Sequence, residues 1–153
     1  MANTYTQLNI HMVLAVKGRE NVLTKNVRKR LNQYIAGIIN GTGAYSLAVD
    51  GYLDHLHLFF ELPPTIALSD FARIVKTNSS KWINLNKLVH GKFAWQIGYG
   101  AFSYAKSQRN NVINYIINQE EHHAKNNFKE EYLKLLEQYD IDFNSKYVFE
   151  FYD

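Results

Sequence analysis

The chain has 153 residues, of which 46% are hydrophobic, and a formal net charge of +3. This length and composition predict one compact domain over residues 1–153, with a hydrophobic core large enough to be stable without disulfides or structural metal ions. The absence of cysteine excludes disulfides, thiolate zinc sites and cysteine nucleophiles, so any metal must use nitrogen and oxygen ligands. No run approaches the roughly 18 apolar residues of a membrane span, and the first residues do not resemble a signal peptide. We therefore expect a cytoplasmic protein with no membrane partner.

Positive charge is concentrated before residue 120. Residues 1–119 contain 13 Lys and Arg against 5 Asp and Glu, whereas residues 120–153 contain 4 against 9. Basic clusters of this kind favour a phosphate-bearing partner, although they are also typical of ordinary solvated helix faces. The candidate phosphate contacts are Lys25, Arg28, Lys29, Arg30, Arg73, Lys76 and Lys81.

The first half of the chain predicts a strand, a helix and a hairpin. Apolar residues alternate with others over residues 8–16, and His11 falls on the polar face of this strand. A helix with one apolar stripe is expected over residues 24–40, capped by a threonine and ended by a glycine. A short strand over residues 45–49 and a tight Asp-Gly turn then lead into a strand over residues 53–62.

The strand over residues 53–62 carries two histidines one residue apart. Because side chains alternate across a strand, His55 and His57 share one face, whereas Leu56 and Leu58 share the opposite core face. With Cβ atoms about 7 Å apart, the two imidazoles can converge on one metal ion. Taken alone, this spacing is more often a pair of solvated strand histidines.

The second half of the chain adds helices to this pattern. A proline pair ends the histidine strand, and a helix over residues 69–85 follows, with Ser69 placed to cap it. A glycine-containing strand is expected over residues 93–102, a third helix over about 107–126, and an amphipathic helix over residues 128–139. The aromatic tail over residues 147–152 should pack on the body or on a second subunit.

The order of these elements predicts an α+β fold. Two βαβ halves joined by a hairpin form a ferredoxin-like or RRM-like βαββαβ sandwich over about residues 3–104. A tyrosine-bearing helix over about 107–126 and a C-terminal helix and tail over 128–153 are added to it. In such a sandwich the helices cover one face of the sheet and leave the other open. The open face would present three histidines to a ligand: His11, His55 and His57.

The third helix has one apolar arc and one polar side. Val112 and Ile116 lie in the arc, whereas Tyr115 and Gln119 are neighbours four residues apart on the polar side. A tyrosine in such a position is most often a partly exposed packing residue. Its pairing with a side-chain amide, in a chain that also contains a His-x-His motif, makes it a candidate functional residue.

Four segments occur in an order that is far more specific than any one of them. They are Asp54–His57, Trp95–Ser103, Tyr115–His123 and Phe128–Glu131. In this combination the chain resembles the single-tyrosine HUH (His-hydrophobic-His) transposases of small insertion sequences and their relatives associated with repetitive palindromes. The similarity covers nearly the whole chain.

The resemblance implies a transposase that cleaves and rejoins single-stranded DNA at hairpin-flanked sites through a covalent 5′-phosphotyrosine. Tyr115 matches the nucleophile of the family, and His55, His57 and Gln119 match its divalent-metal ligands. The family also acts as homodimers, which implies composite sites with the histidines of one chain and the tyrosine of the other. Three residues are secondary candidates near this site: Asp54, His11 and Tyr104.

The chemistry of strand transfer explains these residue types. A tyrosine can store the phosphoryl group as an aryl phosphodiester, but its ordinary pKa near 10 leaves it mostly protonated at neutral pH. Catalysis must therefore come largely from a metal that polarises the phosphate and stabilises the departing 3′ oxygen. Two imidazoles and an amide are neutral ligands that hold a hard ion weakly, so Mg²⁺ or Mn²⁺ supplied with the DNA is expected.

Two other functions compete with this interpretation. RNA-recognition domains share the βαββαβ scaffold and stack bases on exposed strand aromatics, and residues 98–102 partly match their aromatic motif. The chain would then be a non-catalytic single-stranded nucleic-acid-binding module. Alternatively, a metal-dependent nuclease would use water as the nucleophile and Tyr115 would be structural.

Overall fold

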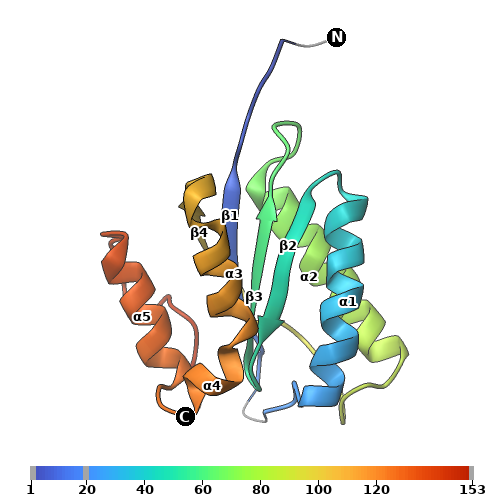
Figure 1. The fold of residues 1–153 in the computed structure, drawn as a ribbon. Helices are drawn as coiled ribbons and strands as arrows, with labels where there is room; N and C mark the ends of the chain where they lie inside the picture. The colour runs from blue at the N-terminus through green and yellow to red at the C-terminus, as the bar shows by residue number, and fades with distance from the viewer. Residues whose placement is uncertain (1–2, 19–20, 152–153) are drawn as a thin grey trace.

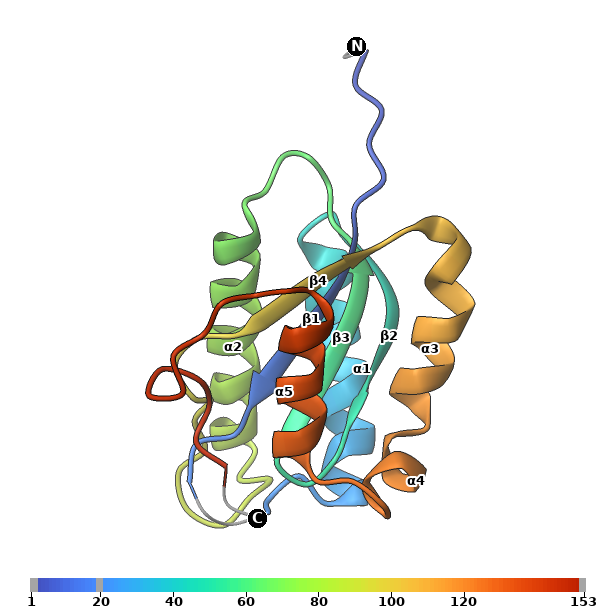
Figure 2. The same cartoon turned by 90° about the vertical axis from the view of Figure 1, so that its left-hand side faces the viewer.

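The computed structural model describes residues 3–18 and 21–151, and it contains one four-stranded antiparallel sheet with helices on both faces (Figures 1 and 2). Its strands lie in the order β2-β3-β1-β4, which is the ferredoxin-like arrangement predicted above. The elements are β1 (Asn9–Ala15), α1 (Lys25–Gly41), β2 (Tyr45–Gly51), β3 (His55–Glu61), α2 (Leu68–Leu85), β4 (Gly100–Tyr104), a 3₁₀ turn (Lys106–Gln108), α3 (Arg109–Ile117), α4 (Gln119–His123) and α5 (Phe128–Gln138).

The larger core lies between one face of the sheet and helices α1 and α2. Met12 and Leu14 of β1 point into it together with Leu56 and Leu58 of β3, as the alternation of the sequence predicts. Helices α1 and α2 bury apolar stripes against these strands. Helix α2 begins at Leu68, so its N-terminal flanking residue is Ala67 and not the predicted cap Ser69. Because side chains alternate along β1 and β3, the histidines of these strands lie on the face of the sheet opposite this core.

Strand β4 is shorter and later than the predicted range of 93–102. The backbone of residues 94–96 hydrogen-bonds to the end of β1 and the residues beyond it, and Trp95 forms an isolated bridge with Val16. Gly98 has a φ of +86°, in the left-handed region that favours glycine, and the chain turns there. The regular ladder with β1 consequently starts only at Gly100.

The second face of the sheet is covered, so the prediction of an open face is wrong. Helix α3 packs over β2 and β3, and α5 packs over β1 and β4 (Figures 1 and 2). The physical reason is that this face also carries apolar residues, among them Val13, Phe59 and Phe102, which must be removed from water. The three strand histidines that we expected to be open to a ligand are consequently fully buried.

The C-terminal segment is part of this second layer. The predicted third helix breaks at Asn118 into α3 and α4, and a short turn then leads to α5. Most of the described tail packs on the body, as predicted, because Phe149 and Phe151 contact Phe128 and Tyr132, whereas Tyr147 is 77% exposed. The side chain of Gln96 fixes the tail by hydrogen-bonding both backbone groups of Glu150. Residue 152, which the predicted tail includes, lies outside the described residues.

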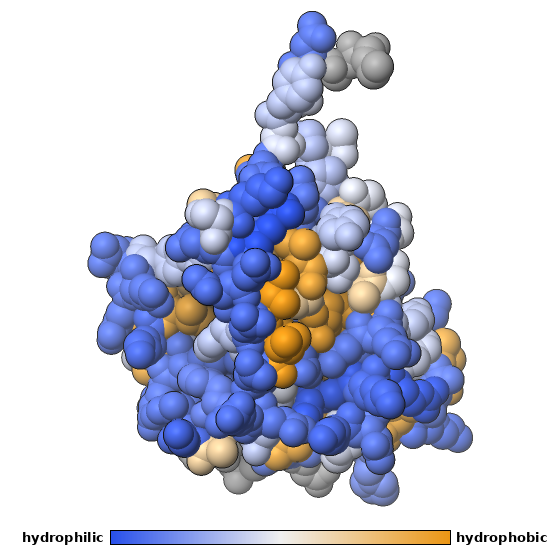
Figure 3. All heavy atoms as spheres, in the orientation of Figure 1, coloured by the Kyte–Doolittle hydropathy of each residue, from blue (hydrophilic) through white to orange (hydrophobic). Residues whose placement is uncertain are grey.

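One side of the molecule exposes apolar surface among hydrophilic side chains (Figure 3). Where α3 meets β2, Ile117 is 54% exposed and Leu47 and Ile113 are only partly buried. Among the described residues, no helix is both long and apolar enough to span a lipid bilayer.

Candidate active site

The two histidines of β3 point into the layer formed by α3, α4 and α5. His55 and His57 are both 0% exposed. Each is oriented by a hydrogen bond to its Nδ1 atom: Asp54 Oδ1 lies 2.7 Å from His55, and His11 Nε2 lies 2.7 Å from His57. These partners direct both Nε2 atoms to the same point, which is the arrangement that usually fixes metal-binding histidines.

A carboxylate from α5 faces both Nε2 atoms. Oε1 of Glu131 lies 3.2 Å from Nε2 of His55 and 3.1 Å from Nε2 of His57. The Glu131 side chain is 2% exposed, and α5 places it there because the helix buries Phe128 and Tyr132 on either side of it. The sequence analysis did not identify Glu131 as a functional residue.

Two side chains of α4 complete the ring around this carboxylate. Oε1 of Gln119 lies 3.1 Å from Nε2 of His55, and its Nε2 donates to Glu131 over 3.1 Å. Nε2 of His123 lies 3.0 Å from the same Gln119 oxygen and 3.2 Å from Oε1 of Glu131. Phe128 covers one side of the site by stacking on His55, with ring centroids 4.0 Å apart. His55, His57, Gln119, His123 and Glu131 therefore form one buried cluster.

The ionisable groups of this cluster shift one another's pKa values. Burial lowers the pKa of His55, but hydrogen bonds to Asp54 and Glu131 outweigh it and raise this pKa to about 9. For His57 burial prevails, and its pKa is lowered. Burial alone would raise the pKa of Glu131, but the facing histidines hold it well below its usual range. The carboxylate is thus fully ionised among these nitrogens.

The tyrosine predicted to be the nucleophile reaches the same carboxylate. The Tyr115 hydroxyl donates a hydrogen bond to Oε2 of Glu131, and its ring lies 5.7 Å from that of His57. Burial and the nearby Glu131 charge raise the pKa of Tyr115 above its ordinary value, so the hydroxyl keeps its proton. All these groups belong to one chain, so the tyrosine and the histidines meet here without exchange of helices between subunits.

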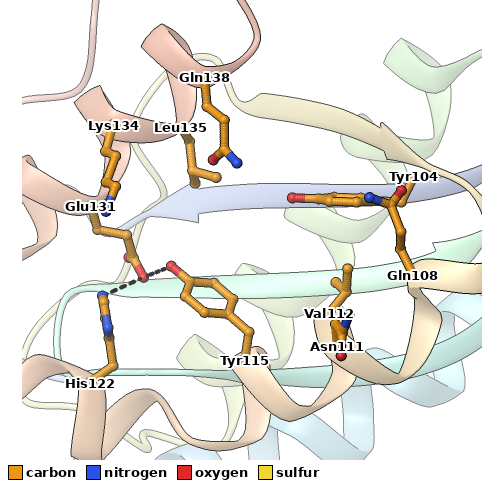
Figure 4. Close-up of a pocket in the computed structure, with 10 residues that line it drawn as sticks. All are labelled: Tyr104, Gln108, Asn111, Val112, Tyr115, His122, Glu131, Lys134, Leu135 and Gln138. Atoms are coloured by element: carbon orange, nitrogen blue, oxygen red, sulfur yellow. Dashed lines mark hydrogen bonds and ion pairs between the residues drawn. The ribbon is translucent and has the colours of Figure 1, made fainter.

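A cavity of about 360 Å³ opens beside the tyrosine, between α3 and α5 (Figure 4). In this view Tyr115 and His122 both point to Glu131 at one end, and Tyr104 lies at the other. Lys134 and His122 add basic groups to the lining, which also contains the carboxylate of Glu131, the two tyrosines, three amides and two apolar side chains.

Tyr104, the second tyrosine near the site, has different surroundings. It lines the cavity but packs against His11, Phe59 and Tyr139, at centroid distances of 6.1, 6.2 and 5.9 Å. Burial and the neighbouring Tyr139 raise its pKa. Of the two tyrosines, Tyr115 is the one whose hydroxyl contacts the buried cluster.

The candidate phosphate contacts do not surround this cavity. Arg28 is 4% exposed; it donates to the Leu23 carbonyl over 2.7 Å and pairs with Glu120 of α4, so its role is structural. Lys76 donates to the carbonyls of Gln96 and Gly98. The remaining five are exposed on α1 and α2, which pack on the opposite face of the sheet: Lys25, Lys29, Arg30, Arg73 and Lys81.

The closed second face also excludes the RNA-recognition alternative in its predicted form. Base stacking on the sheet requires exposed strand aromatics. Phe102, the aromatic that ends the partial motif and lies on β4, is 3% exposed and packs against Tyr139, with centroids 5.0 Å apart. No such platform is available on this strand.

Comparison with known proteins identifies the family. Residues 4–119 match the family described as IS200-like transposases. The ISDra2 transposase TnpA of Deinococcus radiodurans is 25% identical over 118 residues, which cover 74% of this chain and 84% of the relative.

Solved structures agree in fold. A crystal structure from Deinococcus radiodurans R1, described as that of a transposase, superposes with a TM-score of 0.61 at 22% identity, covering 78% of this chain and 95% of that one. A REP-associated tyrosine transposase bound to a REP hairpin superposes with a TM-score of 0.58 at 16% identity, covering 80% and 73%. Since the family match spans most of the chain, the protein belongs to the IS200-like transposases.

Proposed function

We propose that the protein cleaves and rejoins single-stranded DNA at hairpin-flanked sites, with Tyr115 as the nucleophile and a divalent metal bound by His55, His57 and Gln119. The observation that carries this proposal is the convergence of one tyrosine hydroxyl, two imidazoles and one amide group on Glu131, with a cavity that opens beside the tyrosine. Membership of the IS200-like transposases supports DNA strand transfer as the reaction.

The reaction follows from the position of Tyr115. Its phenolic oxygen attacks the scissile phosphorus, the bond from phosphorus to the 3′ oxygen breaks, and that oxygen leaves with a proton as a free 3′-hydroxyl. The chain then holds the other strand end as a 5′-phosphotyrosine. Attack by a second 3′-hydroxyl reverses the step and joins new strands without an external energy source.

The donor atoms fit a divalent metal. The Nε2, Oε1 and carboxylate atoms of the cluster lie 3.0–3.2 Å apart, close to the edge of about 3 Å expected for an octahedron with bonds of 2.0–2.1 Å. A bound Mg²⁺ or Mn²⁺ would polarise the scissile phosphate. The chain's own contribution is to fix the imidazoles through Asp54 and His11, and to exclude water by stacking Phe128 on His55.

Hairpin DNA is the proposed substrate partner. The REP-associated tyrosine transposase of similar fold is described as bound to a REP hairpin, which supports this substrate class. We expect the exposed basic residues of α1 and α2 to contact its phosphates, since their side chains reach solvent even where Lys25 lies 3.9 Å from Glu120 and Arg73 lies 3.7 Å from Asp70. Arg28 and Lys76 are left out of this set because protein groups already occupy them.

A homodimer is part of the proposal, and the half-exposed apolar side chains where α3 meets β2 support it. The composite arrangement predicted from the resemblance, with the histidines of one chain and Tyr115 of the other, stays part of the proposal, although the same groups also meet within a single chain. Mixing Tyr115→Phe chains with chains that lack His55 and His57 tests this. Adduct on the histidine-deficient chain would show exchange between subunits, and its absence in verified heterodimers would support cis sites.

The experiment that tests the proposed reaction is a covalent-adduct assay. Hairpin oligonucleotides with a labelled single-stranded flank are incubated with protein and Mg²⁺ and separated under denaturing conditions. We expect adduct with the wild type and with Tyr104→Phe, and none with Tyr115→Phe. Cleavage without adduct would instead indicate a nuclease that uses water, and adduct in Tyr115→Phe but not in Tyr104→Phe would transfer the role to Tyr104.

A further inference from the structure

The cluster contains two side chains from the C-terminal helices that the proposed function does not use. The family match ends at residue 119, whereas His123 and Glu131 come from α4 and α5 beyond it. Both side chains are 2% exposed, and both approach the atoms that the proposed function assigns to a metal. Burying an unpaired carboxylate is very unfavourable, and Glu131 is accordingly surrounded by imidazole nitrogens and by the Tyr115 hydroxyl.

We propose that Glu131 and His123 are further ligands of the metal site, so that the C-terminal segment completes the coordination sphere. This inference rests on the proposed function and deepens it. Glu131 Oε1 is within 3.1–3.2 Å of three imidazole Nε2 atoms, those of His55, His57 and His123. Three imidazoles, one amide oxygen and one carboxylate oxygen make five donors, which leave one octahedral position for a phosphate oxygen.

The carboxylate changes the character of the site. Neutral ligands alone would hold a hard divalent ion weakly, whereas an ionised carboxylate supplies a negative charge and an oxygen donor that Mg²⁺ and Mn²⁺ prefer. Glu131 also touches the nucleophile, because its second oxygen Oε2 accepts the hydrogen bond of Tyr115. One side chain therefore links the metal site to the reacting hydroxyl, and it does so only while α5 is docked on the sheet.

The local packing explains why this glutamate is held in place. Phe128 stacks on His55, and Tyr132 packs against Phe149 of the tail, with centroids 4.8 Å apart. These two aromatic residues lie three positions before and one position after Glu131 on α5. Docking of the helix by its aromatic stripe thus sets the position of the carboxylate before any DNA is present.

Metal binding measured without DNA tests the inference. Chelator-treated protein is titrated with MnCl₂ by calorimetry, and the wild type should bind one Mn²⁺ per chain. Glu131→Gln keeps the shape of the side chain but removes its charge, so it should weaken Mn²⁺ binding by at least about tenfold. His123→Ala should weaken it in the same direction. The matched controls are Glu130→Gln on the exposed side of α5 and His90→Ala in an exposed loop, and both should bind like the wild type.

The outcomes separate the inference from the proposed function. If Glu131→Gln binds Mn²⁺ as tightly as the wild type, or more tightly, the carboxylate is not a ligand and the inference is overturned. Absence of Mn²⁺ binding by the wild type would overturn the proposed metal site itself. Folding is checked by circular dichroism. Should the glutamine variant fail to fold, Glu131→Asp decides, because a carboxylate one methylene shorter must also lose affinity if it is a ligand.

Discussion

Replacing Arg28 with Met tests whether this arginine holds the fold together or binds DNA. The methionine preserves the apolar stem and its packing but removes the guanidinium. That group is 4% exposed, and its bond of 2.7 Å to the Leu23 carbonyl is buried. Loss of a buried hydrogen bond from a charged donor costs about 1.5–3 kcal/mol. The pair with Glu120 adds at most about 1 kcal/mol, because the Glu120 side chain is 50% exposed.

We therefore expect Arg28→Met to lower the free energy of unfolding by about 2–4 kcal/mol in a urea titration. Arg30→Met is the matched control on the same helix. Arg30 is exposed and lies over the Trp82 ring at 5.7 Å, so its replacement should change stability by no more than about 0.5–1 kcal/mol and should weaken hairpin binding instead. Equal stability of the two variants, with hairpin affinity lost only in Arg28→Met, would refute the structural role of Arg28.

Three further perturbations test the second layer and the metal site. Gly100→Ala should destabilise the fold by about 1–3 kcal/mol in urea titrations, because a Cβ would lie 2.5 Å from the Tyr132 hydroxyl; unchanged stability would contradict the close packing of α5 on β4. Phe128→Ala should cost about 3–5 kcal/mol and speed amide exchange in α5, and slow exchange there would show that the stack on His55 does not anchor the helix. Mn²⁺ at 100 times its Kd should stabilise the wild type by about 2.7 kcal/mol in thermal melts, reversibly with chelator, and should have no such effect on the double variant His55→Ala/His57→Ala; equal stabilisation of both would place the ion elsewhere.

Much of the sheet could be predicted because strand alternation is a local property. The alternation around Met12 and Leu14, and around Leu56 and Leu58, states directly which face is apolar, and the structure confirms it. The same pattern placed His55 and His57 together on the other face. It could not show that this face is covered, because covering depends on segments more than 50 residues away in the sequence.

The surroundings of Glu131 and Arg28 were not predicted, for the same reason in both cases. Glu131 was not singled out as a site residue, although it lies on the same buried side of α5 as Phe128 and Leu135. Arg28 was assigned to a basic surface, although it shares the buried stripe of α1 with Leu31. A charged residue at helical spacing with apolar ones is the signal that could have identified both.

The break between α3 and α4 was also beyond prediction. Tyr115 and Gln119 were expected as neighbours on one continuous helix, but Asn118 separates two helices of different direction (Figure 2). The amide of Gln119 still reaches His55 because α4 turns toward the sheet. Helical spacing predicted that Tyr115 and Gln119 lie close together, but it did not predict that they belong to two different helices.

The opposite surroundings of the two chain ends have a practical consequence for protein production. Residues 3–8 are exposed and extend away from the body, so a fusion partner attached before them would meet nothing that the site requires (Figure 1). Phe149 and Phe151, by contrast, press on the aromatic ring that stacks on His55. A tag appended after the tail would be attached close to that aromatic stack. Purification handles for metal-binding and adduct measurements therefore belong on the N-terminal side.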